Sequence, residues 1–421
     1  MESIKIYPSK LCGSVTAPPS KSDSHRALIC AALCDGPTVI KNCGNSDDIN
    51  ATISVLSGFG ATFMRNGNEI TVYPAKTAKP ISKVADCNES GSTLRFLLPV
   101  AAALGVETEF VGKGRLPLRP IDTLTDLLNN HNVKCNGSTL PLKISGKLLS
   151  GLYRLAGNIS SQYISGLLIA LSVTKGQSKI ELTTVLESKP YVDMTLDTLK
   201  KFGADIIVTD DGYLINGKEH LTPCEYTVEG DWSQAAFFMV AGALGNGITL
   251  KGLNLNSFQG DKKIIDVLKT CGADVSISED GITVKNGDLK AIEIDGSQIP
   301  DIVPIISVLS AFCEGTTTIH SVERLAIKES NRITETVSRL NTFGIDAICT
   351  HNTITVTKSV PHGTEIDSAN DHRIVMSFAV LASMCQNESI INNFTAINKS
   401  YPDFFKDFKN TGGKVDVINN G

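Results

Sequence analysis

The chain has 421 residues, of which 42% are hydrophobic and 20% charged, and its 44 acidic and 39 basic residues give a net charge of −5. This length supports two domains with cores of their own. The negative charge argues against nucleic acid as a bulk electrostatic partner but leaves room for local basic pockets that bind small anions. Apolar runs are shorter than a membrane span, and the first residues carry no apolar signal run. The 11 cysteines lack the spacing of a metal site or a redox pair, so we expect mostly buried thiols in a cytoplasmic protein without metal.

Left-handed helix ends recur along the chain. A glycine follows an amphipathic helical pattern about every 70 residues, and asparagine replaces it once, because asparagine also tolerates the left-handed conformation. These positions are Gly60, Asn132, Gly203, Gly272, Gly344 and Gly412. Turn signals follow three of them, at Asn66-Gly67, Asp211-Gly212 and Asp280-Gly281. Each signal lies between alternating apolar residues and predicts a hairpin.

A second series lies halfway between these glycines. Here a polar cluster opens a helix that is apolar nearly all round, which predicts a buried helix. The helices begin near Ser22, Ser92, Ser161, Ser233, Asp301 and Asp371. Most of them lead into a short strand.

Together the two series predict an α/β fold of six repeated βαβαββ units with buried parallel helices. Six units favour two domains, each a pseudo-threefold repeat of three units, over residues 14–225 and 226–421. Residues 1–13 are expected to join the second domain, where they complete the hairpin of the last unit. Two crossings between domains favour closure of a cleft over a ligand.

The starts of the buried helices are candidate anion sites, because helix N-termini carry free N–H groups and partial positive charge. Lys21 and Arg26 flank a hydroxyl-rich start at Ser22, and Gly91 allows a ligand to approach the backbone at the next one. The third start offers a set of neutral donors and acceptors, namely Ser160, Ser161 and Gln162.

Charged residues gather at the helix starts and loops of the C-terminal half. Asp301 at the fifth start has two equal interpretations, a simple helix cap or a base. In Ile327–Arg332 the neighbours Lys328 and Glu329 shift each other's ionisation, and Asn331 or Ser330 is the expected N-cap of a helix that begins at Arg332. Alone, that stretch would be a solvated helix start. Further cations or hydroxyls occupy equivalent loops and starts, namely Arg119, Ser188, Arg373 and Lys399.

Because these residues recur at equivalent points of the repeat, we expect a cleft that binds two anionic small molecules. Asp301 and the Lys328–Glu329 pair are available there for proton transfer.

The chain resembles the 5-enolpyruvylshikimate-3-phosphate (EPSP) synthase family from about Ser14 to Asp403. Each motif is weak by itself, but their joint order and spacing are specific. The motifs are Pro19–Ser22 with Arg26, Ser90–Arg95, Leu118–Pro120, Ser160–Gln162, Ser188–Tyr191, Glu229–Asp231, Ile299–Asp301, Ile327–Arg332, Asp371–Arg373 and Asn398–Ser400.

The resemblance implies a two-domain fold of three units each and a reaction that joins shikimate 3-phosphate to phosphoenolpyruvate with release of phosphate. It implies no organic cofactor, and we expect a monomer that contacts neither nucleic acid nor membrane. The implied shikimate 3-phosphate contacts are Lys21, Ser22, Arg26, Ser160, Ser161, Gln162, Ser188, Asp301 and Lys328. The implied phosphoenolpyruvate contacts are Lys21, Gly91, Arg119, Gln162, Arg332, Arg373 and Lys399.

By the same resemblance, Asp301 is the base for the attacking hydroxyl, and Glu329 beside Lys328 is the proton source. Which member of that pair donates stays open, because the two titrate together. Gly91 resembles the glycine of glyphosate-sensitive members, whereas Arg324 departs from the family pattern and leaves one contact unassigned.

Two alternatives compete with this interpretation. The sister enzyme that transfers enolpyruvyl to a UDP-linked amino sugar carries Lys-Asn at the first helix start and a cysteine in a later loop, whereas this chain has Lys21-Ser22 and no cysteine in residues 112–115. A non-catalytic binding protein for phosphorylated metabolites would need no acid–base residues.

Overall fold

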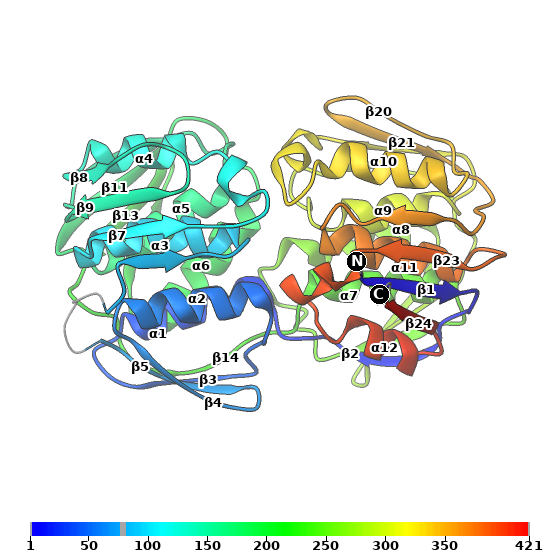
Figure 1. The fold of residues 1–421 in the computed structure, drawn as a ribbon, viewed down its shortest axis with the longest axis horizontal. Coiled ribbons are helices and arrows are strands. Elements are labelled where there is room, and N and C mark those ends of the chain that lie inside the picture. Colours follow the sequence, from blue (N-terminus) through cyan, green and yellow to red (C-terminus); the bar gives the residue numbers. More distant parts are fainter. Residues whose placement is uncertain (1, 76–80, 420–421) are drawn as a thin grey trace. The chain divides into compact units, whose positions relative to one another are not determined.

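The computed structural model describes residues 2–75 and 81–419. It divides into two compact units (Figure 1). The N-terminal unit is Pro19–Glu229, and the C-terminal unit combines the residues up to Pro18 with those from Gly230 onward. The chain therefore passes between the units a few residues later, both times, than the boundaries expected at residues 14 and 225.

Each unit contains three four-stranded sheets of one design, in which the first two strands are parallel and the rest antiparallel. In the N-terminal unit the first sheet has the order β14 (Glu225–Thr227), β3 (Thr38–Lys41), β5 (Glu69–Tyr73) and β4 (Thr62–Asn66). The second sheet is β6 (Val84–Asp86), β7 (Thr108–Val111), β9 (Leu142–Gly146) and β8 (Val133–Cys135). The third sheet is β10 (Leu152–Leu155), β11 (Gly176–Leu182), β13 (Gly212–Gly217) and β12 (Asp205–Thr209).

The C-terminal unit repeats the design. Its first sheet is β2 (Gly13–Thr16), β15 (Ile248–Lys251), β17 (Gly281–Lys285) and β16 (Asp274–Ser278). The second sheet is β18 (Glu293–Asp295), β19 (Thr316–His320), β21 (Thr353–Thr357) and β20 (Ala347–Cys349). The third sheet is β22 (Glu365–Asp367), β23 (Ser389–Asn392), β1 (Glu2–Tyr7) and β24 (Lys414–Asn419).

Strand pairing at the chain ends confirms one prediction and adds a feature. β1 pairs antiparallel with β24 along its whole length, so the N-terminal residues do complete the last hairpin. β2 comes directly before the first helix but pairs with β15, and β14 comes directly before the fourth buried helix but pairs with β3. The two units thus exchange their first strands.

The predicted buried helices are present in both units. They are α1 (Lys21–Ala32), α3 (Gly91–Leu104) and α5 (Ser161–Ser172), and α7 (Trp232–Leu244), α9 (Val303–Ser310) and α11 (His372–Ser383). Their apolar residues form the centre of two separate cores, one in each unit. The fold class expected from the sequence is confirmed.

A second set of helices links the parallel strands to the hairpins. These are α2 (Asp47–Gly58), α4 (Asp122–Asn129), α6 (Lys189–Lys201), α8 (Ile264–Cys271), α10 (Arg332–Thr342) and α12 (Phe404–Asn410). Short 3₁₀ helices precede four of them, at η1 (Leu116–Leu118), η2 (Gly260–Lys263), η3 (Glu323–Ile327) and η4 (Phe394–Lys399). In residues 2–75 and 81–419 we find no helix with the length and apolar character needed to cross a membrane.

All six predicted left-handed helix ends are confirmed. Backbone φ is positive at the five glycines and is 66° at Asn132. Two hairpin turns end one residue earlier than predicted. Gly212 and Gly281 are the first residues of the second strands of their hairpins and not part of the turns. A Cβ on Gly212 would lie 2.0 Å from the Ile180 carbonyl oxygen, so glycine is needed there for close strand approach.

Candidate active site

The three buried helices of the N-terminal unit start with serine caps. The side chains of Ser20, Ser90 and Ser160 accept hydrogen bonds from backbone N–H groups of the first turns of α1, α3 and α5. Each cap lies one or two residues before the predicted start. Neutral caps satisfy one donor without adding a charge, while α1 also carries the buried Asp23 in its first turn.

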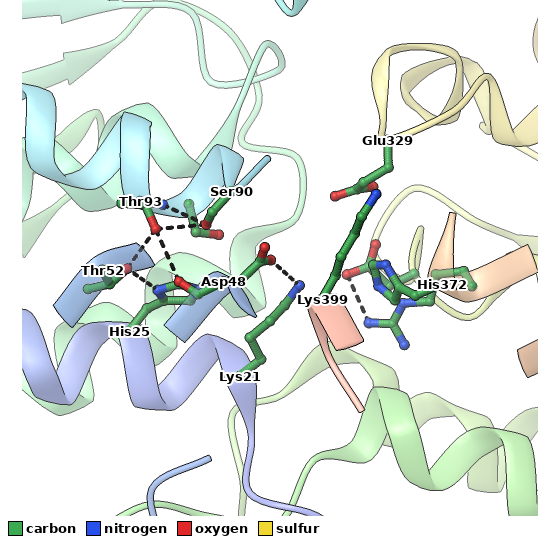
Figure 2. Close-up of polar contacts among 12 residues, drawn as sticks. Lys21, His25, Asp48, Thr52, Ser90, Thr93, Glu329, His372 and Lys399 are labelled. Atoms are coloured by element: carbon green, nitrogen blue, oxygen red, sulfur yellow. Dashed lines mark hydrogen bonds and ion pairs between the residues drawn. The ribbon is translucent and has the colours of Figure 1, made fainter. Parts of the chain in front are cut away.

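Lys21 opens α1 and pairs with an acid that the sequence analysis did not single out. Its Nζ lies 2.7 Å from Oδ2 of Asp48 in the first turn of α2 (Figure 2). The two side chains are only 14% and 10% exposed. The pair therefore holds the ammonium group at the start of α1.

Arg26 links α1 to α6 through hydrogen bonds. Its guanidinium donates to Thr195 Oγ1 at 2.8 Å, to the Ser22 carbonyl at 2.6 Å and to the Tyr191 carbonyl at 2.7 Å. Burial lowers the pKa of Arg26 to about 10, which leaves it cationic at neutral pH. Ser188, the residue before α6, is buried and has a φ of 51°, a conformation that residues other than glycine adopt uncommonly.

Gly91 faces two guanidinium groups. A Cβ built on Gly91 would lie 2.6 Å from Arg119 Nη1 and 2.7 Å from Arg95 Nη1. Arg95 Nη1 donates to Gln162 Oε1 at 3.0 Å, and Gln162 Nε2 donates to Ser92 Oγ at 2.8 Å. Three expected residues, Gly91, Arg119 and Gln162, are therefore neighbours. Arg95 belongs with them, and its position one helical turn after Gly91 is the signal that could have identified it.

In the C-terminal unit, Arg332 is the centre of an ion-pair cluster. It is 1% exposed, and its guanidinium lies 2.9 Å from Asp301 Oδ1, 2.6 Å from Glu329 Oε2 and 2.8 Å from Asp371 Oδ2. Burial acts to lower the pKa of Arg332, but the three carboxylates outweigh it and raise the pKa. The predicted cap at Asn331 is confirmed, since its side chain accepts from Thr334 N–H.

Asp301 is surrounded by cations. Lys328 Nζ lies 3.5 Å from Oδ1, and Arg373 Nη2 lies 3.6 Å from Oδ2. Burial acts to raise the pKa of Asp301, but Lys328, Arg373 and Arg332 together hold that pKa well below its usual range. The pKa of Lys328 is lowered, chiefly by burial. The residue before α9 is Ile302, which makes no side-chain cap bond.

Asp371 belongs to one of the sequence motifs but was not among the expected contacts. Besides Arg332 it accepts from Ser330 Oγ at 2.9 Å, and it caps α11 through the Arg373 N–H at 2.9 Å. One fully buried carboxylate thus fixes two of the expected arginines.

Arg373 and Lys399 complete the set of cations in this unit. Arg373 is 4% exposed, packs over the Phe237 ring, and donates from neither Nε nor Nη1 to any acceptor among the described residues. Such buried donors require an acceptor. Lys399, whose side chain is drawn in Figure 2, ends η4. Its Nζ donates to the Asn370 carbonyl at 2.6 Å.

The residues of the described ranges contain no group of three or more histidine, cysteine, aspartate or glutamate side chains arranged to hold a metal ion. What the geometry offers is anion binding at the helix starts of both units and an ionised carboxylate beside a lysine in the C-terminal unit.

Comparison with known proteins assigns the chain to a family. Residues 6–408 match the family described as EPSP synthase (3-phosphoshikimate 1-carboxyvinyltransferase). The chain is 42% identical to a 3-phosphoshikimate 1-carboxyvinyltransferase of Clostridium beijerinckii, with 100% of both sequences covered. It is 43% identical to the enzyme of the same name from Clostridium novyi, over 99% of both.

Solved structures agree with this assignment. The EPSP synthase of Acinetobacter baumannii matches with a TM-score of 0.85 at 25% identity over 100% of both chains. The enolpyruvyl transferase NikO of Streptomyces tendae shares the fold, with a TM-score of 0.81 at 18% identity over 100% of both chains. The chain therefore belongs to the EPSP synthase (3-phosphoshikimate 1-carboxyvinyltransferase) family.

Proposed function

We propose that this protein transfers the enolpyruvyl group of phosphoenolpyruvate to the 5-hydroxyl of shikimate 3-phosphate and releases phosphate. The observation that carries the proposal is the Asp301 cluster, where a carboxylate with a lowered pKa lies beside Lys328 and shares Arg332 with Glu329. A chain of this family that kept only ligand binding would have no use for such an acid–base set. The product serves the biosynthesis of chorismate and aromatic amino acids.

The proposed reaction begins with protonation of the methylene carbon of phosphoenolpyruvate by the Lys328–Glu329 pair. The neighbouring carbon becomes cationic and is stabilised by nearby carboxylates. Asp301, which is ionised at neutral pH, takes the proton of the 5-hydroxyl as the oxygen attacks that carbon. The Lys328–Glu329 pair then takes back a proton from the methyl group of the tetrahedral adduct, while phosphate leaves with the proton held by Asp301, which restores the double bond and the starting protonation states.

The proposed contacts divide by substrate. Shikimate 3-phosphate would contact Lys21, Ser22, Arg26, Ser160, Ser161, Gln162, Ser188, Asp301 and Lys328. Phosphoenolpyruvate would contact Lys21, Gly91, Arg119, Gln162, Arg332, Arg373 and Lys399. Support comes from the neighbouring Gly91, Arg119 and Gln162, and from the two buried donors that Arg373 directs to no acceptor in the described chain.

The test is phosphate release by purified protein. Phosphate should appear only when both shikimate 3-phosphate and phosphoenolpyruvate are present. Replacing shikimate 3-phosphate by UDP-N-acetylglucosamine tests the sister activity in the same assay. Phosphate release with the UDP-sugar, or none with either acceptor, would contradict the proposal.

Three further properties are part of the proposal. The first is a location in the cytoplasm. All 11 cysteines lie within the described residues and are free thiols, and a reducing compartment keeps thiols in that state. We expect a monomer, which sedimentation equilibrium would check. We also expect inhibition by glyphosate that competes with phosphoenolpyruvate, because Gly91 leaves the start of α3 open beside Arg119; turnover that is unaffected by glyphosate would contradict this.

A further inference from the structure

A chain of hydrogen bonds joins the N-terminal halves of α1, α2 and α3 in the N-terminal unit (Figure 2). His25 Nδ1 lies 2.8 Å from Thr52 Oγ1, which lies 2.7 Å from Thr93 Oγ1. Thr93 Oγ1 lies 2.8 Å from Ser90 Oγ and 3.3 Å from the Asp48 carbonyl oxygen. The side chains that form these hydrogen bonds, His25, Thr52, Thr93 and Ser90, are fully buried.

We propose that the His25–Thr52–Thr93 chain positions the groups at the starts of α1 and α3 that contact the anionic substrates. These three residues touch no substrate in this proposal and act through Lys21 and Gly91. The inference rests on the proposed function and adds residues for which that function gave no role.

The acceptors at one end of the chain and the imidazole at the other favour one proton direction. Thr93 Oγ1 has two acceptors within reach, the Asp48 carbonyl oxygen and Ser90 Oγ, and when it donates to either of them it accepts from Thr52. Thr52 has then used its one proton and must accept from His25. The imidazole therefore carries its proton on Nδ1.

His25 is held in the neutral form that this direction requires. Burial, followed by the positive charges of Lys21 and Arg26, keeps its pKa well below the usual value for histidine. Nε2 is buried and has no hydrogen-bond partner among the described residues, while the ring meets Phe96 edge-on at 6.4 Å. The opposite tautomer would bury an unpaired N–H and reverse every bond of the chain.

Asp48 and Ser90 connect the chain to the proposed contacts. The Asp48 carboxylate holds Lys21 Nζ at 2.7 Å, while the carbonyl of the same residue accepts from Thr93. Ser90 caps α3 and precedes Gly91, where Arg119 lies. The chain thus sets the ammonium of α1 and the first peptide of α3 at a fixed separation.

Thr52→Val tests the chain at its centre, because valine keeps the shape and removes the hydroxyl. We expect KM for shikimate 3-phosphate to rise about tenfold with little change in kcat. An interaction made equally with the substrate and with the transition state affects KM alone when it is lost. Thr52→Ser should restore KM. The matched control is Thr174→Val, a buried threonine that donates to the Ala170 carbonyl at the far end of α5; it should leave KM unchanged even where it lowers Tm.

The tautomer gives a readout that does not depend on turnover. Long-range ¹H–¹⁵N spectra of protein labelled in its seven histidines should show His25 protonated on Nδ1 in the wild type, with the signal assigned by its loss in His25→Asn. Thr52→Val should shift His25 away from that tautomer. A wild-type signal protonated on Nε2, or unchanged KM in Thr52→Val, would overturn the inference. Absence of phosphate release by the wild type, with His25 protonated on Nδ1, would instead count against the proposed function alone.

Discussion

The buried helices of the two units start differently. In the N-terminal unit the caps are Ser20, Ser90 and Ser160. In the C-terminal unit α7 and α11 are capped by Asp231 and Asp371, and Asp301 lies just before α9. The same repeat therefore presents hydroxyls in one unit and carboxylates in the other.

The difference separates two tasks. Hydroxyl caps add no negative charge of their own to these helix starts, and Lys21 at the start of α1 is held by Asp48 on α2 instead. Carboxylates at the starts of α9 and α11 need a buried cation, which Arg332 supplies, and their shifted ionisation makes proton transfer available. Under the proposed function, a change of residue type at one position of the repeat adds acid–base chemistry to a site that otherwise binds anions.

The largest effect should come from Asp301→Asn, which keeps the shape of the side chain and removes the base. We expect kcat to fall about 10³-fold, within the range typical of general bases. Phosphate release measures it. Asp295→Asn is the control, because Asp295 lies at the end of β18 and accepts hydrogen bonds from Ser297 rather than from the Arg332 cluster. Near-normal turnover of Asp301→Asn would end the assignment of chemistry to the C-terminal unit.

Asp371→Ala should unfold the C-terminal unit more easily. Removing one partner of a buried ion pair leaves an uncompensated charge and costs about 3 kcal/mol. Asp193→Ala in the N-terminal unit breaks the exposed pair with Lys189, 2.7 Å apart, and should cost at most about 1 kcal/mol. Urea unfolding midpoints compare the two variants, and equal losses would show that the carboxylate caps are no more demanding than a surface pair.

Glu329→Gln should lower kcat about 100-fold while substrate affinity remains measurable, because a proton donor is lost from the coupled pair. Glu335→Gln on α10 is the control, because Glu335 pairs with Arg339 at 2.7 Å. Single-turnover rates separate chemistry from product release. If Glu329→Gln keeps the wild-type rate, Lys328 alone donates the proton.

Gly91→Ala tests the binding role of the N-terminal unit. The added Cβ would lie 2.6 Å from Arg119 Nη1, so the guanidinium must move. We expect KM for phosphoenolpyruvate to rise about tenfold with little change in kcat, because the lost contact binds the substrate and the transition state equally well. Gly137→Ala, where a Cβ meets nothing within 4 Å, should have no effect. A fall in kcat without a change in KM would place chemistry in this unit too.

The smallest effect concerns the pH dependence of Asp261. Burial, followed by the charge of Asp301, raises the pKa of Asp261 from 3.8 to about 7. Between these values the folded state binds more protons than the unfolded state, so the stability contributed by Asp261 is full below pH 3.8 and is lost as pH rises toward 7.

Asp261→Asn should remove that loss. The unfolding free energy of the variant relative to the wild type should therefore increase between pH 4 and pH 7, by at most about 1.4 kcal/mol per pH unit. Chemical denaturation at several pH values measures it. A difference that stays constant with pH would mean that Asp261 is ionised throughout.

Much of the fold follows from local sequence signals. The glycines and Asn132 at the helix ends, the apolar helices and the hairpins were predicted because each depends on a few neighbouring residues. Even the pairing of β1 with β24 was predicted, since an unpaired last strand needs a partner. The exchange of β2 and β14 between units was not, because both strands precede a buried helix in the same way and only long-range pairing distinguishes them.

The candidate site divides in the same manner. The sequence by itself determined which residue types open each helix, and so where anions and acid–base groups gather. Only the tertiary structure decided that Asp48 holds Lys21, that Arg95 joins Gln162, and that Asp371 binds Arg332. The physical reason is range: capping and helix dipoles act within one turn, whereas the partner of a buried charge is whichever opposite charge the packing of other helices brings within about 3 Å.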